Sequence, residues 1–173
     1  PDFLFLGGLS ALQLERHDKA SEQLQQLLER FPGHSLVGDA LYYLGYAYFY
    51  QTSFDKAIPI FTRVVEEFPH LNSASDALFR IAECRFNLGL FKQAEKDYKK
   101  VIQRYPQSPL REDATYNIAW CLMESVAIEE GGEQAVGVVE AFKTYLDQYP
   151  QGRHVETAHY TLAEISFNQG ELE

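Results

Sequence analysis

The side chains that could do covalent chemistry are spread thinly along the chain, and their spacings match no reaction or metal site. The five histidines include no pair at the i, i+4 spacing of a helical metal site. Adjacent acids such as Glu66 and Glu67 point to different sides of a helix, so they do not pair as a general acid and base. The chain also has no glycine-rich phosphate loop and no nucleophile elbow. We therefore expect no catalytic residue, no cofactor, no metal ion and no enzymatic activity.

Noncovalent binding is a different matter, because residues 38–51 read GDALYYLGYAYFYQ and contain six aromatic side chains, five of them tyrosines. Such density suits a cofactor box, a base-stacking platform, a membrane anchor or a helical core. Fifteen Lys and Arg against 25 Asp and Glu leave a net charge of -10, which repels phosphate backbones. The sequence contains no run of about 18 apolar residues, which is the length that a membrane-spanning helix needs. We therefore expect neither nucleic acid nor direct membrane insertion.

The elements that must position these rings are set by an internal repeat. Aromatic-proline pairs end at Pro32, Pro69, Pro106 and Pro150, with intervals of 37, 37 and 44 residues. The corresponding repeats are 1–33, 34–70, 71–107, 108–151 and a partial repeat, 152–173. Aligning them gives columns of small residues, one of which contains Gly8, Gly45, Ala82, Ala119 and Ala163. Columns of small residues indicate close contacts between helices.

Each repeat is expected to form two amphipathic helices, so the fold class is all-α. The first helix starts near an Asp-Ala-Leu phrase, and the second ends at the proline, whose ring nitrogen cannot donate to the helix ladder. Three columns of the second helix are expected in the core: Ala20, Ala57, Ala94, Val138; Leu24, Phe61, Tyr98, Phe142; and Leu27, Val64, Val101, Tyr145. Cys84 and Cys121 share another buried column and are expected to be core residues, not a disulfide.

The repeat resembles the tetratricopeptide repeat. Repeat two matches its signature at Leu41, Leu44-Gly45, Tyr48, Ala57, Phe61, Val64 and Pro69, whereas repeat three departs from it at Arg85. The resemblance implies a right-handed superhelical solenoid of antiparallel helix pairs that binds a protein or peptide segment in a concave groove. The 37-residue period, with its DAL(Y/F) and (F/Y)P phrases, looks like the bacterial envelope subgroup. That subgroup includes an outer-membrane-assembly lipoprotein and a Tol-Pal-associated cell-division coordinator.

This subgroup implies a periplasmic or outer-membrane-associated scaffold. The alternatives are a cytoplasmic adaptor, a regulatory domain of an enzyme, and a structural solenoid that self-associates through uncapped ends. No capping helix is visible, so we expect the parent gene to continue with a helix after Glu173. Seven extra residues within CLMESVAIEEGGEQ should lengthen the first helix of repeat four by about 10 Å, with Gly131-Gly132 as its stop. They could serve as a docking handle or as a neutral extension.

A helical projection separates the rings of residues 38–51 into two stripes. Five rings lie together on one side, and only Tyr48 falls on the stripe expected to be buried. Tyr42 and Phe49 belong to columns that are large and apolar or aromatic in every repeat, which predicts a scaffold role. Other columns on this side vary between repeats, as expected of positions adapted to a ligand. The predicted partner-binding residues are Tyr43, Tyr46, Tyr50, Arg80, Asn117 and Trp120.

Four acids occupy one further column, at Asp2, Asp39, Asp76 and Asp113. They either favour the dipole of the helix whose first turn they occupy or form an acidic rim that selects a basic or neutral peptide. A clamp for a C-terminal carboxylate would need lysines beside Arg80 and Asn117, and these are missing.

Overall fold

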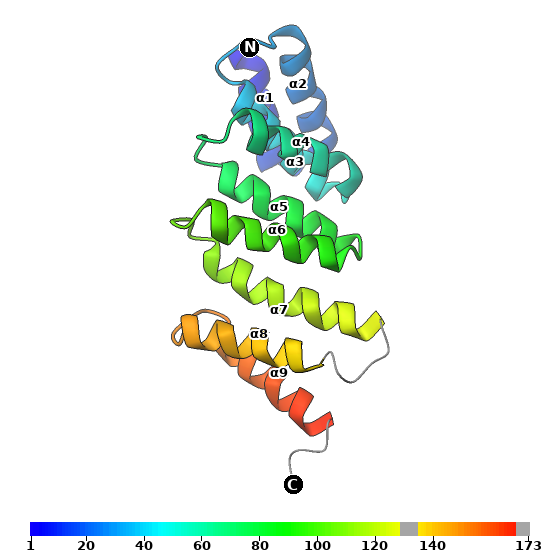
Figure 1. Cartoon of the computed structure of the whole chain (residues 1–173). Helices are drawn as coiled ribbons and strands as arrows, with labels where there is room; N and C mark the ends of the chain where they lie inside the picture. The colour runs from blue at the N-terminus through cyan, green and yellow to red at the C-terminus, as the bar shows by residue number, and fades with distance from the viewer. Residues whose placement is uncertain (129–134, 169–173) are drawn as a thin grey trace. The chain divides into compact units, whose positions relative to one another are not determined.

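The computed structural model describes residues 1–128 and 135–168, and all the regular structure in these ranges is helical (Figure 1). The helices are α1 (Asp2–Gln13), α2 (His17–Arg30), α3 (Val37–Tyr50), α4 (Phe54–Glu67), α5 (Ala74–Asn87), α6 (Phe91–Arg104), α7 (Arg111–Ile128), α8 (Ala135–Gln148) and α9 (Val155–Asn168). The expected all-α class and the two helices of each full repeat are confirmed.

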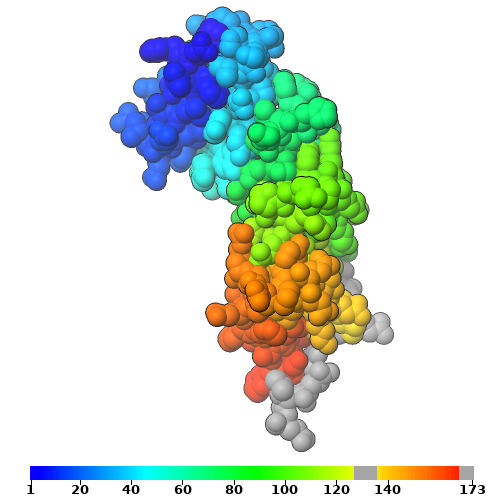
Figure 2. Space-filling view, turned by 90° about the vertical axis from the view of Figure 1, so that its left-hand side faces the viewer, coloured from blue at the N-terminus to red at the C-terminus, as the bar shows by residue number. Residues whose placement is uncertain are grey.

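The chain divides into two compact units, Pro1–Leu90 and Phe91–Glu173. The first contains α1 to α5 and the second α6 to α9. Within the first unit, each helix packs on the next, and α3 also contacts α1 and α5. The first helices of neighbouring repeats are therefore close enough to exchange side-chain contacts. Figure 2 shows one face of this unit in a space-filling view, coloured from blue at the N-terminus to green at α5.

The second helices end where the aromatic-proline pairs predict. The residues after α2 and α4 are Phe31 and Phe68, and a proline follows each. The turn between the two helices of a repeat has its own signature. Glu15, Thr52 and Gly89 all have positive φ, of 55°, 55° and 72°. These positions are one repeat apart, so the left-handed turn belongs to the repeat itself, although only Gly89 adopts it without strain.

The three core columns of the second helices are buried as predicted. Their twelve members are at most 3% exposed. Gly45 shows how tightly the helices approach, since a Cβ there would lie 2.5 Å from a ring carbon of the fully buried Phe61. Gly8, Ala82 and Ala119 of the same column are also buried, but Ala163 on α9 is exposed because no second helix covers it among the described residues.

Helix α7 is longer than its counterparts, as the seven-residue insertion predicts. It has 18 residues, whereas α3 and α5 have 14 each. The four additional residues correspond to about 6 Å of helix. The proposed stop at Gly131-Gly132 lies outside the described residues.

Candidate functional site

Five aromatic side chains of α3 gather on one side of the first unit, and we call them the aromatic face: Tyr42, Tyr43, Tyr46, Phe49 and Tyr50. Successive rings meet edge to face or tilted, with centroids 5.0 to 6.5 Å apart. The opposite side of α3 is buried against its neighbours through residues such as Leu41, Leu44 and Ala47. The stripe predicted from the helical projection is confirmed, because the 3.6-residue period alone determines which side chains share a side.

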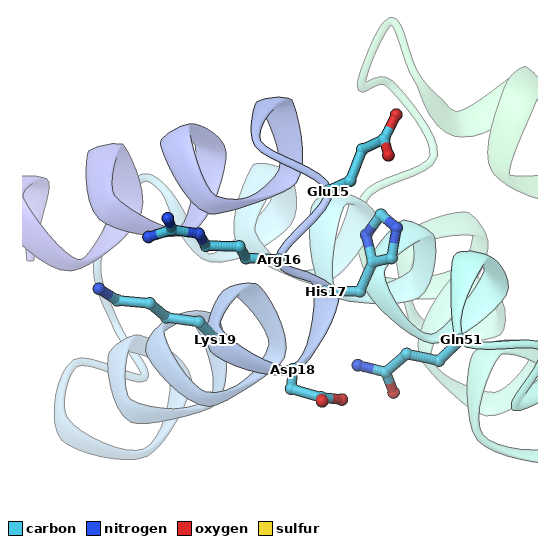
Figure 3. Close-up of a pocket in the computed structure, with 6 residues that line it drawn as sticks. All are labelled: Glu15, Arg16, His17, Asp18, Lys19 and Gln51. Carbon is cyan, nitrogen blue, oxygen red and sulfur yellow. The ribbon is translucent and has the colours of Figure 1, made fainter.

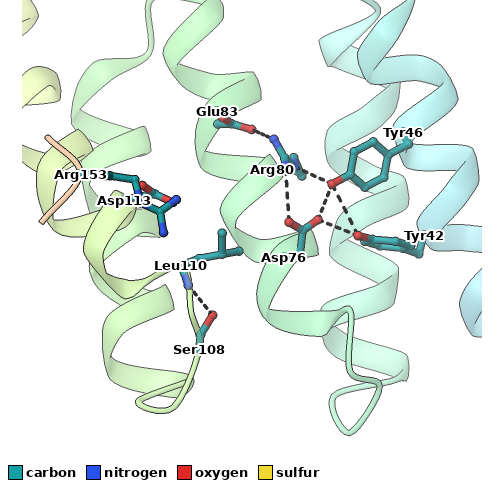
Figure 4. A network of polar contacts seen from close by, with 9 residues as sticks. All are labelled: Tyr42, Tyr46, Asp76, Arg80, Glu83, Ser108, Leu110, Asp113 and Arg153. Atoms are coloured by element: carbon teal, nitrogen blue, oxygen red, sulfur yellow. Dashed lines mark hydrogen bonds and ion pairs between the residues drawn. The ribbon is translucent and has the colours of Figure 1, made fainter.

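A polar network joins this face to α5 (Figure 4), and we call it the tyrosine-aspartate network: Tyr42, Tyr46, Asp76, Arg80 and Glu83. The hydroxyls of Tyr42 and Tyr46 both donate to Oδ2 of Asp76, at 2.9 and 2.7 Å. Arg80 donates from Nε to the Tyr46 hydroxyl at 2.8 Å and from Nη1 to Glu83 at 2.6 Å. Its Nη2 forms a longer ion pair with Asp76, at 3.4 Å.

Burial raises the pKa values of the network's hydroxyls. It raises the pKa of Tyr42 to about 12, and the carboxylate of Asp76 adds to the effect. The pKa of Tyr46 is raised further, again chiefly by burial. Burial alone would lower the pKa of Arg80, but the carboxylates of Glu83 and Asp76 reverse this and raise it. Both tyrosines therefore stay protonated donors, and Arg80 stays charged, across the physiological pH range.

The network leaves Arg80 poorly suited to binding a carboxylate from a partner. Each of its three side-chain nitrogens already has an acceptor within the protein. Its guanidinium carbon also lies 5.2 Å from the centre of the Tyr46 ring and 5.8 Å from that of Phe49. With two carboxylates and one cation, the network has a net charge of minus one. The aromatic face is thus backed by a weakly acidic, internally satisfied cluster.

Tyr50 is the most open ring of the aromatic face, with 56% of its surface exposed. It stacks on His17, at the start of α2, with ring centroids 5.2 Å apart. His17 in turn lines a pocket of about 430 Å³ (Figure 3), together with Glu15, Arg16, Asp18, Lys19 and Gln51. The acids Glu15 and Asp18 balance the bases Arg16 and Lys19, so the pocket offers no net charge that would select a charged ligand.

The predicted partner-binding residues fall in both units. Tyr43, Tyr46, Tyr50 and Arg80 come together in the first unit, around the aromatic face. Asn117 and Trp120 lie on α7 in the second unit, where both are half-buried. Trp120 meets the core ring of Phe142 edge to face at 6.0 Å, so part of its area is used within the fold.

Tyr48 is less buried than the helical projection predicts. Its ring is half-buried, packs beside the core of α2 and α3, and accepts a hydrogen bond from Gln25. The phenol reaches past the core to the surface, which an aliphatic side chain at this position could not do.

A second polar cluster ties the start of α7 to the loop before α9, within the second unit. The His154 ring stacks on Tyr116 with centroids 4.1 Å apart, and its Nε2 lies 2.8 Å from Asp113. Arg153 donates to the same carboxylate at 3.2 Å. Glu112 accepts from the Tyr145 hydroxyl at 3.0 Å. These contacts hold the α8–α9 loop on α7 and give Arg153 and His154 a structural role.

The repeat pattern did not predict the contacts of the aspartate column. It correctly places Asp2, Asp39, Asp76 and Asp113 in the first turns of their helices. It does not predict that Asp76 accepts from two tyrosines of the previous repeat. The sequence contained a signal, because only repeats two and three combine a tyrosine at the Tyr42 position with an acid at the aligned Asp76 position of the next repeat.

Cys84 and Cys121 are fully buried and unpaired with each other, as expected of core residues. Burial raises the pKa of each thiol to about 12, which keeps both of them unreactive near neutral pH. Within residues 1–128 and 135–168, no three His, Cys, Asp or Glu side chains converge in a way that could hold a metal ion. None of the helices described is both long and apolar enough to cross a membrane.

Comparison with protein families agrees with this architecture. Two family models, each described as tetratricopeptide repeat, match residues 5–72 and 76–108. Together they span more than half of the chain. The chain therefore belongs to the tetratricopeptide repeat family. No curated protein matches the sequence in a direct search.

Several solved structures have the same fold. MamA from Desulfovibrio magneticus RS-1 superposes with a TM-score of 0.72 at 16% identity, covering 98% of this chain and 85% of that one. A putative kinesin light chain of Podosopora anserina with nearly identical repeats gives 0.70 at 15%, covering 99% and 87%. YrrB, described as having an unusual peptide-binding site, gives 0.62 at 22%, covering 88% and 71%. At these identities the likeness establishes the fold.

Proposed function

We propose that this protein is a non-enzymatic scaffold whose aromatic face binds an extended or helical segment of a partner protein. The observation that carries the proposal is the aromatic face of α3, where Tyr50 is exposed, the other four rings are half-buried, and tyrosine is far more frequent than in the equivalent helices. Tyrosine supplies large contact area with few rotatable bonds, and it is enriched at the energetic centres of interfaces. YrrB, a protein of the same fold, has a peptide-binding site.

The chemistry around the face favours a basic or neutral segment. The tyrosine-aspartate network beneath it has one cation against two carboxylates. Asp39 adds another carboxylate in the first turn of α3. A Lys or Arg side chain of the partner can lie over the open ring of Tyr50 and be attracted by both the ring and the nearby acids. A partner carboxylate would meet an arginine that already pairs with two carboxylates of its own protein.

The experiment uses a phage-displayed library of random twelve-residue peptides selected on the protein. We expect selected peptides to be enriched in Lys or Arg and to bind with affinities measurable by fluorescence anisotropy. The double variant Tyr43→Ala and Tyr50→Ala should bind them about tenfold more weakly, the loss expected for hot-spot tyrosines. These two residues are chosen because they lie outside the tyrosine-aspartate network. Tyr43 also packs on Phe5 and on the core of α2 and α3, so the comparison requires a double variant that is still folded.

The matched control is Tyr160→Ala on α9, which removes an equally exposed tyrosine, 64% against 56% for Tyr50. Its effect on binding should stay within about twofold. If the double variant remains folded by circular dichroism and binds the selected peptides as tightly as the unaltered protein, the aromatic face is not the binding site.

The role in cell-envelope assembly belongs to this proposal as its finer part, and partner binding by Asn117 and Trp120 of the second unit is a separate prediction. The envelope role rests on the 37-residue period and on the DAL(Y/F) and (F/Y)P phrases. It predicts a periplasmic or outer-membrane-associated protein. Fractionation of native cells with an antibody against the protein tests it, and recovery in the cytoplasm would favour the adaptor alternative. Light scattering on the full-length protein tests self-association.

A further inference from the structure

Helix α6 carries a charge opposite to that of the rest of the chain. It contains four lysines and one arginine against Glu95 and Asp97, whereas each other described helix is neutral or acidic. The chain as a whole has a formal charge of -10. An isolated cationic helix on an acidic protein is an electrostatic feature that helix formation alone does not explain.

The lysines of α6 form one continuous surface, which we call the lysine stripe: Lys92, Lys96, Lys99 and Lys100. At 100° per residue they fall within a sector of about 100°, directly opposite the buried Ala94, Tyr98 and Val101. From Lys92 to Lys100 the stripe extends about 12 Å along the helix. All four residues are exposed.

The two carboxylates of α6 offset part of the charge of the stripe, but they are less exposed than the lysines that they pair with. Glu95 pairs with Lys99, and Asp97 pairs with Lys100 at 2.8 Å. The acid side chains are only 18% and 2% exposed, while their lysine partners are 51% and 60% exposed. The acids therefore lie toward the core and the ammonium groups lie outside them. A partner approaching α6 from solvent meets positive charge first.

We propose that the lysine stripe is a docking surface for a short acidic segment of a protein partner, separate from the aromatic face. A segment with three or four carboxylates within about 12 Å would match the stripe. Nucleic acid and anionic membranes are disfavoured, because the stripe is short and the chain as a whole carries a formal charge of -10. Charges separated by more than about 8 Å at physiological salt are largely screened, so a compact acidic segment is the better match.

The test uses an eight-residue peptide containing five glutamates, titrated into the isotope-labelled protein and followed by NMR. We expect chemical shift changes centred on α6 and a dissociation constant that rises steeply between 50 and 300 mM salt. The variant Lys92→Gln, Lys96→Gln, Lys99→Gln should bind about tenfold more weakly, the size expected when three exposed ion pairs are lost. Replacement of the same lysines by arginine should retain binding. That result would show that the positive charge of the stripe, not the integrity of the helix, is responsible for binding.

The matched control is Lys19→Gln, Lys56→Gln, Lys143→Gln, which lowers the net charge equally at exposed sites on α2, α4 and α8. It should change peptide binding by less than twofold. An equal loss in both triple variants would mean a general charge effect and would overturn the proposal. Chemical shift changes centred outside α6 would also overturn it. The same holds if an oligothymidine or phosphatidylserine vesicles bind the stripe more tightly than the peptide does, or if the protein forms a dimer that depends on these lysines.

Discussion

Replacing Asp76 with alanine should destabilise the first unit more than the loss of an ordinary first-turn aspartate. Asp76 is the shared acceptor of two tyrosine hydroxyls and an ion-pair partner of Arg80. Its side chain is only 20% exposed. The variant removes the carboxylate that both hydroxyls share and leaves Arg80 with Glu83 and the Tyr46 hydroxyl.

The magnitude follows from the contacts. A hydrogen bond to a charged group contributes about 1.5 to 3 kcal/mol. Two such bonds would set an upper range of about 3 to 6 kcal/mol, which partial access of water to the freed hydroxyls reduces. We expect Asp76→Ala to lower the free energy of unfolding by about 3 kcal/mol.

Asp39→Ala is the matched control. Asp39 occupies the same position in the first turn of α3 as Asp76 does in α5, one repeat earlier. It should lose only the favourable interaction with the helix dipole, below about 1 kcal/mol. Urea unfolding monitored by circular dichroism compares the two, with equal m-values as the sign that they unfold alike. If the two variants differ by less than about 0.5 kcal/mol, the tyrosine-aspartate network does not stabilise the fold.

Three further predictions concern turns, pH and packing. Thr52→Gly should raise the free energy of unfolding by about 0.5 to 1 kcal/mol, and Gly89→Thr should lower it by about 1 kcal/mol, because both sites have positive φ. Urea unfolding measures both changes, and two changes of the same sign would contradict this reasoning. Stability should fall between pH 10 and about 12, because Tyr42 ionises near 10.0 when unfolded but near 12 when folded. The unfolded state thus binds fewer protons in this range, so the free energy of unfolding falls as pH rises. Tyr42→Phe should reduce this pH dependence by up to about 1.4 kcal/mol per pH unit in urea titrations. An unchanged pH dependence would argue against a buried hydroxyl. Gly45→Ala should cost about 1 kcal/mol net, as overpacking against Phe61 exceeds the gain in helix propensity; a higher melting temperature would refute the close approach.

Much of the fold could be predicted because it repeats. Every repeat must bury the same faces against its neighbours, so the column containing Leu24, Phe61 and Tyr98 indicates burial in each repeat independently. The prolines fix the ends of the second helices for a local reason, the missing backbone donor. The aromatic face could also be predicted from the sequence, since it depends only on the helical period. The predicted partner-binding residues, by contrast, remain a prediction.

The individual roles of polar side chains could not be predicted in the same way. Asp76 and Asp39 look identical in the aligned repeats, yet only Asp76 lies opposite two tyrosine hydroxyls. His154 has no equivalent in the repeat pattern, and its stacking on Tyr116 depends on the path of the loop before α9. Such contacts join side chains about 30 to 40 residues apart, and their geometry depends on how neighbouring helices pack.

The sequence by itself determined the helices, the repeat, the buried columns and the side of α3 on which the rings lie, because helical period, chain-breaking proline and apolar burial are local or repeated constraints. Only the tertiary structure decided that Arg80 is bound by its own protein, that Tyr48 reaches the surface, and that the acids of α6 lie beneath its lysines. Those outcomes depend on distances between atoms of packed helices, and a hydrogen bond or ion pair is sensitive to differences of less than 1 Å that residue type and spacing do not specify.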